Sequence, residues 1–230
     1  MSLNLAIHLT SMLLALAFIL QSLEHLHIRN AERTLFLPRL ILSFLLLLGF
    51  WPKWVCLMLL VNAMFILKRF QGPYNGGSDR MGLLILFCLC LVHWVPAPQW
   101  KEYIFGYLAL QLVLSYFIAG WVKVVNHDWR TGQALQDVFQ FSAYPVSESL
   151  RGWAHRPTLL FVMSWSVIIF EISFPFMLLT PITLTIGLSI AALFHLANAH
   201  LFGLNRFFWI WISAYPALLW LQSRVFQYVS

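Results

Sequence analysis

The sequence predicts an all-α, polytopic integral membrane protein: a bundle of about eight transmembrane helices with short interfacial helices. Of its 230 residues, 61% are hydrophobic and 10% are charged, whereas a soluble domain carries about 25% charged residues. Apolar runs of nearly membrane-spanning length alternate with short polar connectors. Many of the 11 tryptophans lie near the ends of these runs, as an interfacial aromatic belt requires. The spans use up the length, so we predict a single transmembrane domain over residues 1–230 with no separate soluble domain.

The first three spans lie in residues 1–67. No Lys or Arg precedes the first run, so it lacks the basic region of a signal peptide and is expected to be retained. Residues 21–39 are polar and predict an interfacial connector. The next two runs are short and are separated by Pro52-Lys53, so they are either two spans, one re-entrant pair, or one kinked span. The predicted spans are residues 3–20, 40–51 and 54–67.

Turn-forming residues and prolines delimit the other five spans. Gly72-Pro73 predicts a turn, and Ser78 or Asp79 is expected to cap the helix that follows. A long polar insertion, residues 125–157, is expected to contain an interfacial helix. These five spans are predicted at residues 81–95, 103–124, 158–179, 181–201 and 207–221.

The charge distribution predicts the orientation and the surroundings of the chain. The net charge is +6, but the basic residues lie in short connectors rather than in one block, which favours anionic lipid headgroups over nucleic acid. Eleven Lys and Arg residues follow spans one, three, five and seven, and three lie on the other side. The bias predicts that both termini are outside and that Lys123 is at the cytoplasmic end of its span. We expect a multi-pass protein, in the inner membrane if its source is bacterial.

Residues 115–132, SYFIAGWVKVVNHDWRTG, are the most informative stretch. In a helix, Tyr116, Gly120 and Lys123 lie at i, i+4 and i+7 and share one face. Gly120 has no side chain, so another group can approach the backbone beside the lysine. Lys123 is either an anchor that extends to the lipid headgroups or a functional group, because burial favours the neutral amine, which is a base.

Two further ionisable residues lie inside apolar runs. An unpaired carboxylate at the position of Glu171 costs at least about 2.5 kcal/mol, so Glu171 is neutral, is paired, or lines a cavity. Pro175, four residues later, removes a helix hydrogen bond to the Glu171 carbonyl. His195 and Asn198 are spaced i, i+3 on one face. The pair Glu171 and His195 is either an interhelical polar contact or part of a Lys–Glu–His site with Lys123.

A metal site is not expected. Glu24, His25 and His27 could contact a metal, but two histidines at i, i+2 diverge on a helix. The sequence has no H-E-x-x-H, H-x-x-x-H, C-x-x-C, P-loop or G-x-S-x-G motif. Their absence argues against zincins, histidine-box oxygenases, thiol oxidoreductases, ATPases and serine hydrolases as first choices.

The pattern YFIAGWVK followed by Trp129 and Gly132 resembles the HTTM membrane family, which includes vitamin K-dependent γ-glutamyl carboxylase. In that family a Tyr-Phe-x-Ala-Gly helix precedes a lysine, a Trp and a Gly. One residue must be inserted before Trp129 to align this chain. The resemblance runs in order over about residues 35–220 and includes GGSD, FEISFP and LFHLANAHLFGLNRF. The family's second functional histidine has no clear equivalent, and Asp79 or Arg80 lies nearby.

The resemblance implies quinone chemistry in the membrane. A reduced quinone, vitamin K-like or ubiquinone, would enter from the lipid, Lys123 would take its hydroxyl proton, and O₂ would add to the quinolate. His195 and Glu171 would steer or relay protons, and Tyr116, Gly120, Trp129, Asn198 and Asp79 would contribute to binding. The carboxylase has a large extramembrane domain without a counterpart in these residues, so only the chemistry of the membrane core is implied. The carboxylase works on the lumenal side, opposite to the side that the charge count predicts for Lys123.

Two functions are therefore compatible with the sequence. The first is a quinone-linked membrane enzyme with a lysine base, of carboxylase-like or oxidoreductase-like type, which modifies a co-produced peptide or a lipid partner. The second is a non-catalytic accessory protein or carrier that binds a quinone or a lipid. An enzyme whose base is Lys123 should not tolerate Arg at that position, because Arg does not deprotonate.

Overall fold

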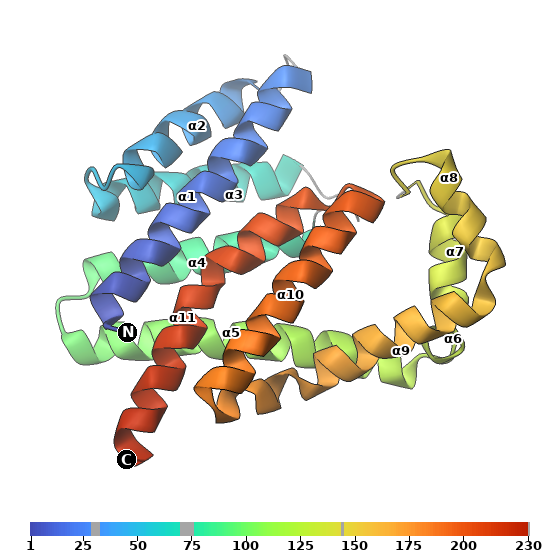
Figure 1. Ribbon diagram of the computed structural model, residues 1–230. Coiled ribbons are helices and arrows are strands. Elements are labelled where there is room, and N and C mark those ends of the chain that lie inside the picture. Colours follow the sequence, from blue (N-terminus) through green and yellow to red (C-terminus); the bar gives the residue numbers. More distant parts are fainter. Residues whose placement is uncertain (29–32, 70–75, 144, 230) are drawn as a thin grey trace. The chain divides into compact units, whose positions relative to one another are not determined.

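The structure, a computed structural model, describes residues 1–28, 33–69, 76–143 and 145–229. These residues form helices and no strands, as predicted (Figure 1). The chain divides into two units. The first comprises Met1–Leu110 and Arg206–Ser230, and the second comprises Gln111–Asn205. Each unit is described by itself.

The first unit is a group of long helices packed in sequence order. In it α1 contacts α2 and α4, α2 contacts α3, and α3 contacts α4 (Figure 1). Its core holds fully buried aromatic and aliphatic side chains such as Phe18, Phe36 and Leu86. The helices are α1 (Leu3–Ile28), α2 (Arg33–Leu47), α3 (Pro52–Arg69), α4 (Gly76–Trp94), the first part of α5 (Pro98–Val125), and nearly all of α11 (Asn205–Val229).

The α2–α3 connection excludes one of the three arrangements predicted for the short apolar runs. Four residues join the helices, and among them Gly49 has φ 74° and Trp51 has φ 43°. These left-handed conformations reverse the chain, and α2 packs on α3. A single kinked span is therefore excluded. Whether the two helices cross the membrane or re-enter it stays a prediction, because the 15 residues of α2 fall short of a full span.

Residues 21–28 and 33–39 of the predicted interfacial connector are helical, and their position at the membrane interface stays a prediction. Helix α1 continues to Ile28, and α2 begins at Arg33. Arg39 is buried, and its guanidinium lies 3.9 Å from the centre of the Phe18 ring. A long arginine stem packs against apolar neighbours, and a planar guanidinium stacks well on an aromatic face. A polar sequence is therefore helical here and is partly internal.

The start of α4 also differs from the prediction. Ser78 and Asp79 lie inside the helix, which begins at Gly76, so neither is the expected cap. The Asp79 carboxylate instead accepts a hydrogen bond from Gln21 Nε2 at 3.2 Å. The turn predicted at Gly72-Pro73 lies outside the described residues.

Glu24 and His25, near the end of α1, contact side chains of other helices. His25 stacks on Phe36 at 3.9 Å between ring centres, and its Nε2 lies 2.8 Å from Arg206 Nη2. Glu24 pairs with Arg206 at 3.4 Å. These contacts join α1 to α2 and to the start of α11.

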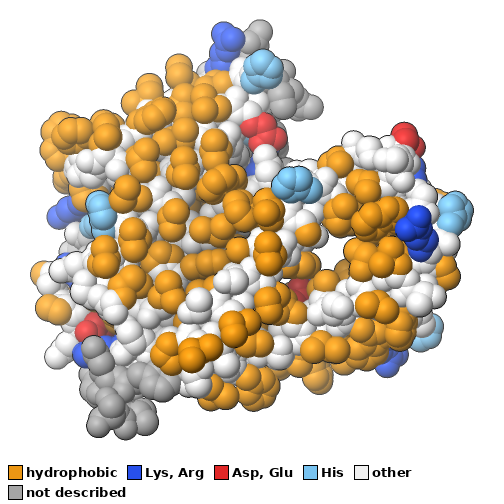
Figure 2. Space-filling model, viewed as in Figure 1, with side chains coloured by type: hydrophobic (Ala, Val, Ile, Leu, Met, Phe, Trp, Pro, Cys, Tyr) orange, Lys and Arg blue, Asp and Glu red, His pale blue; other side chains and the backbone are white. Residues whose placement is uncertain are grey.

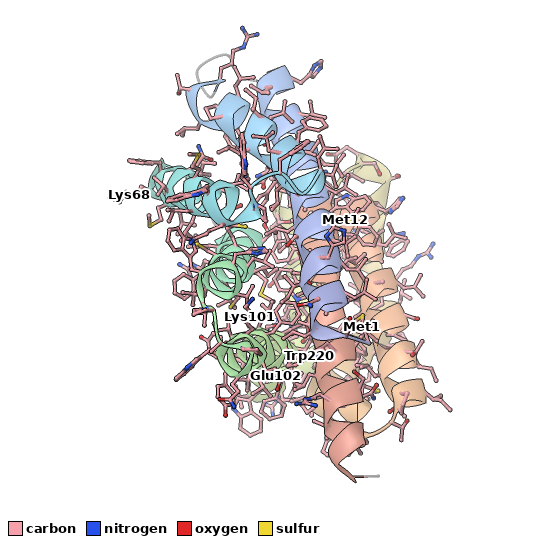
Figure 3. All side chains as sticks on the ribbon, turned by 90° about the vertical axis from the view of Figure 1, so that its left-hand side faces the viewer. Met1, Met12, Lys68, Lys101, Glu102 and Trp220 are labelled. Atoms are coloured by element: carbon pink, nitrogen blue, oxygen red, sulfur yellow. The ribbon has the colours of Figure 1, made fainter. Side chains whose placement is uncertain are left out.

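Contacts between α5 and α11 complete the first unit. Arg224 pairs with Glu102 at 3.1 Å, and Trp220 packs edge-on against Phe105 with 5.9 Å between ring centres. The labelled Glu102 and Trp220 lie close together in Figure 3. The last helix is thus held to the start of α5 by both an ion pair and aromatic packing.

The second unit places four short helical segments at one end of two long helices. Besides the end of α5, it contains α6 (His127–Thr131), α7 (Gln133–Phe141), α8 (Glu148–Arg151), η2 (Gly152–His155), α9 (Pro157–Ser173), η3 (Phe174–Leu179) and α10 (Pro181–Phe202). Leu135 and Phe139 on α7, Ala154 on η2 and Leu160 on α9 form a buried cluster. The helix predicted in the polar insertion is confirmed, whereas its interfacial position stays a prediction.

Five of the described helical segments are long and apolar enough to cross a membrane. Apolar side chains are also exposed over large parts of the visible face of both units (Figure 2), as expected for a chain solvated by lipid. Each of the eight predicted spans overlaps a described helix, although residues 48–51 of the second span form the α2–α3 connection. The five segments are Leu3–His27, Gly77–Trp94, Pro98–Val125, Pro157–Leu179 and Pro181–Phe202.

Candidate functional site

Gly120 allows α9 to approach α5 closely, one turn before Lys123. A Cβ at this position would lie 2.8 Å from Glu171 Cβ and 2.8 Å from the Ile172 backbone nitrogen. Such distances are sterically forbidden, so only glycine permits this approach. The sequence indicated that a group can approach the backbone at Gly120, and in the structure α9 does so through Glu171 and Ile172.

Lys123 and Glu171 form an ion pair across this contact. Lys123 Nζ donates to Glu171 Oε2 at 2.6 Å and lies 3.4 Å from the Ala119 carbonyl oxygen. The Glu171 side chain is 5% exposed and that of Lys123 is 16% exposed. A short charge-assisted hydrogen bond of this kind is among the stronger polar contacts available to a partly buried pair. Lys123 is thus held inside the unit rather than extended as a free anchor.

The helix geometry changes two residues after Glu171, at the end of α9. The α-helix ends at Ser173, and Phe174–Leu179 continue as a 3₁₀ helix that contains Pro175. This agrees with the predicted loss of the hydrogen bond to the Glu171 carbonyl, because proline has no N–H to donate. Gly187 on α10 accommodates the turn, since a Cβ there would lie 2.8 Å from Met177 Cγ.

Tyr116 and His195 form a second pair on the same face of α5. Tyr116 Oη and His195 Nε2 are 2.9 Å apart, and both residues are buried. The Tyr116 ring stacks on Phe174 at 4.1 Å and meets Phe170 edge-on. Seven residues separate Tyr116 from Lys123, which is about 10 Å along a helix. Among these described side chains, no hydrogen bond joins His195 to Lys123 or Glu171.

The α6–α7 corner brings Trp129 to the lysine. Gly132 has φ 82°, and a Cβ there would lie 2.9 Å from the Phe161 backbone nitrogen, so this position needs glycine for both conformation and space. Ser164 Oγ donates to the Trp129 carbonyl oxygen. The Trp129 ring centre lies 5.1 Å from Lys123 Nζ, within the range of a cation–π interaction.

A cavity of about 420 Å³ is lined by Lys123 and Trp129, among other residues. The Asn198 side chain also lines it and makes no hydrogen bond to a described residue. The Ser166 hydroxyl, in contrast, donates a hydrogen bond to the Val162 carbonyl oxygen. The volume is typical of a small-molecule site, as are mostly apolar walls with a few polar groups. The other lining residues are Leu135, Val138, Val162, Met163, Val167, Phe194, Ala197, Leu201, Phe202 and Leu204.

Comparison with known proteins agrees with the resemblance seen in the sequence. The family model described as the HTTM domain matches residues 93–222, more than half of the chain. The chain belongs to the HTTM family. This domain is associated with vitamin K-dependent carboxylase-like membrane proteins, and with the apolar helices it indicates an integral membrane protein. No solved structure matches the chain.

The HTTM match contains seven of the eight candidate residues, in a different grouping from the predicted one. Lys123, Trp129 and Asn198 line the cavity, and Glu171 lies behind Lys123. His195 and Tyr116 form a separate pair, so the predicted Lys–Glu–His constellation divides into two. The eighth residue, Asp79, belongs to the first unit and bonds Gln21.

Several residues around the candidate site were not singled out in the sequence. The aromatic side chains Phe170, Phe174 and Phe194 surround the Tyr116–His195 pair. The phenylalanines of the FEISF segment, one residue before and three after Glu171, were an available signal, because i, i+4 residues share a helix face. Ser164 had no such signal, since its partner lies 35 residues away.

Proposed function

We propose that the chain is a membrane-embedded, quinone-linked enzyme of the HTTM type in which Lys123 acts as a base on a reduced quinone. The observation that supports this most directly is the position of Lys123: the residue lines an apolar cavity, and its Nζ contacts a buried carboxylate. A base needs access to the proton it removes and a place to send its own proton. Lys123 has both.

The cavity residues suit a flat ring that carries oxygen atoms. Trp129, Phe194 and Phe202 supply aromatic walls, and the side chains of Lys123 and Asn198 can hydrogen-bond ligand oxygens. The lining is otherwise almost entirely apolar, which fits a ligand that arrives from the lipid. When bound, a reduced quinone supplies an acidic hydroxyl and two electrons.

The residues of the chain perform the proton transfer in this proposal. Lys123 Nζ first passes its own proton to Glu171 Oε2, and the neutral amine then accepts the proton of a ligand hydroxyl, which leaves an ammonium beside an uncharged Glu171 and a ligand anion. The 2.6 Å contact requires no side-chain movement for the first step. Trp129 restrains the amine by its ring face and helps to exclude water from it. The Tyr116–His195 pair, two helical turns away, holds α10 against α5 and is a positioning pair.

The partner of the reaction is also a proposal. A co-produced peptide or a lipid in the same membrane would be the molecule modified, whereas a non-catalytic quinone-binding protein would need no such partner. The cavity is compatible with both functions. The substitution of Lys123 distinguishes them, because arginine keeps the positive charge but does not act as a base at neutral pH.

Mass spectrometry of co-purified quinones and lipids tests the binding part of the proposal. We expect a stoichiometric quinone with the wild type, its loss in Lys123→Ala, and its retention in Lys123→Arg. Lys101→Ala, which changes a lysine near the other end of α5, is the matched control and should retain the quinone. Finding only bulk phospholipid in every sample would contradict the proposal that the cavity binds a quinone.

Oxidation of added quinol tests the base. We expect the wild type and Lys101→Ala to oxidise the quinol in the presence of O₂, and Lys123→Arg to lose at least about 100-fold in rate, the contribution typical of a general base. Full activity of Lys123→Arg with bound quinone would leave a binding protein rather than a lysine-base enzyme.

A further inference from the structure

Glu171 affects the charge at the cavity, although it is not one of the lining residues. The carboxylate does not line the cavity, yet it contacts Lys123, which does. Together the two side chains carry no net charge. This holds for an ammonium and a carboxylate, and equally for an amine and a carboxylic acid. The net charge of the pair therefore does not depend on which atom holds the proton.

We propose that Glu171 is a specificity-determining residue that restricts the cavity to ligands with an uncharged polar head and excludes anionic amphiphiles. A membrane offers many molecules with an apolar chain and an anionic head, such as fatty acids and acidic phospholipids. A lone lysine in the wall of an apolar cavity would bind those heads by charge. The buried counter-charge of Glu171 removes that attraction before any ligand arrives.

The geometry around the pair supports this role. Glu171 Oε2 lies 2.6 Å from Lys123 Nζ, and its side chain is 5% exposed. An anionic head at Lys123 would have to compete with a carboxylate already in contact, in surroundings where the repulsion between the two anions is poorly screened. No described side chain other than Lys123 brings a positive charge to the cavity wall. An uncharged head avoids this repulsion and can still hydrogen-bond Asn198.

The proposal concerns the same cavity as the proposed function but does not depend on the redox chemistry. It requires only that the cavity binds an amphiphile with its polar head at Lys123. It also implies a gain of binding, which a merely structural role of Glu171 does not predict. Glu171→Gln keeps the shape of the side chain and leaves Lys123 as an uncompensated cation.

The experiment compares two probes with the same chain and different heads, oleyl alcohol and oleate. Purified protein in a neutral detergent is equilibrated with each radiolabelled probe, and apparent Kd values are measured. We expect the wild type to prefer oleyl alcohol. We expect Glu171→Gln to bind oleate about tenfold or more tightly than the wild type does, because it gains a charge-assisted contact, with little change for oleyl alcohol.

Two variants test whether the gain is due to the charge at Lys123. In the double variant Lys123→Met/Glu171→Gln the oleate gain should disappear, because neither charge remains. Asp128→Asn is the matched control: it makes the same charge change on a side chain that is 61% exposed in the same unit, and it should leave both affinities unchanged.

The results separate this proposal from the proposed function. Equal wild-type affinities for oleate and oleyl alcohol would overturn it, and this outcome does not require any variant to fold. An oleate gain in Asp128→Asn as large as that in Glu171→Gln would overturn it as well. If no quinone co-purifies but Glu171→Gln gains oleate, the proposed function fails while the selectivity stands. If a quinone co-purifies but the protein does not discriminate between the two heads, the proposed function stands and the selectivity fails.

Discussion

At the residue scale, the missing side chain of Gly120 decides whether the Lys123–Glu171 pair forms. The pair depends on α9 lying against the α5 backbone, and the nearest atoms to a Cβ at Gly120 are Glu171 Cβ and the Ile172 backbone nitrogen. Backbone atoms cannot rotate away as the end of a flexible side chain can. A substitution here therefore separates the two helices at the site itself.

We expect Gly120→Ala to destabilise the protein by about 1–3 kcal/mol, the usual cost of overpacking a close contact. Gly106→Ala on the same helix is the control, because the nearest atom to its Cβ would be 4.0 Å away. Alanine there should be neutral or should stabilise by up to about 1 kcal/mol through helix propensity. Thermal unfolding of both variants in detergent makes the comparison, and equal stability would argue against the close α5–α9 contact.

The sequence identified the ionisable residues of the site but not their pairing. Lys123, Glu171 and His195 were found by one rule: a polar group in an apolar run needs a partner or a function. Which side chains pair depends on how each helix is rotated and how closely the helices pack, and a local sequence pattern does not contain that information. For this reason His195 was grouped with Lys123 and Glu171, whereas its partner is Tyr116.

At the element scale, the α6–α7 corner positions one wall of the cavity. Gly132 ends α6 in a left-handed conformation and directly precedes α7. Leu135 and Val138 on α7 line the cavity, as does Trp129 on α6. The conformation of one glycine thus determines where a short amphipathic helix meets α9.

We expect Gly132→Ala to cost about 1–3 kcal/mol, because the residue is in a left-handed conformation and also contacts the Phe161 backbone. Gly152→Ala is the control: its φ is −60°, and a Cβ there meets no atom within 4 Å. Gly152→Ala should change the free energy of unfolding by no more than about 0.5 kcal/mol. Thermal unfolding measures both, and limited proteolysis of the α7 region should be faster only in Gly132→Ala.

Helix ends were the least accurate part of the sequence-based prediction. Apolar runs indicate where lipid contacts a helix, whereas a helix continues as long as its backbone hydrogen bonds are satisfied. Polar residues at the end of α1 and the start of α2 therefore extend both helices beyond their apolar runs. Prolines gave accurate starts for α9 and α10, because Pro157 and Pro181 occupy first-turn positions.

At the scale of the whole molecule, the unequal distribution of Lys and Arg predicts the orientation. With eight spans, the connector that contains α6 to η2 lies on the side that carries 11 of the 14 basic residues. That side is expected to be cytoplasmic. The resemblance to the carboxylase implies the opposite side for Lys123, so a direct measurement decides between the two.

Cysteine labelling measures the orientation, since the three native cysteines are buried. We expect Ser2→Cys to react with a membrane-impermeant maleimide in intact cells. Ser149→Cys, at another exposed serine, should react only after permeabilisation. Both positions lie outside the cavity and its supporting contacts. The reverse result would place the Lys123 end on the outer side, as the carboxylase resemblance implies.

The amino-acid sequence by itself determined the class of the protein, the positions of its main helices, the family, and the ionisable residues inside apolar runs. These properties depend on composition and local periodicity, which neighbouring residues carry. Only the tertiary structure decided that α2 and α3 are separate helices, that Lys123 meets Glu171 while Tyr116 meets His195, and that Lys123 lines a cavity. These depend on contacts between residues 48 or 79 positions apart, because helix approach and rotation, rather than local pattern, bring such residues together.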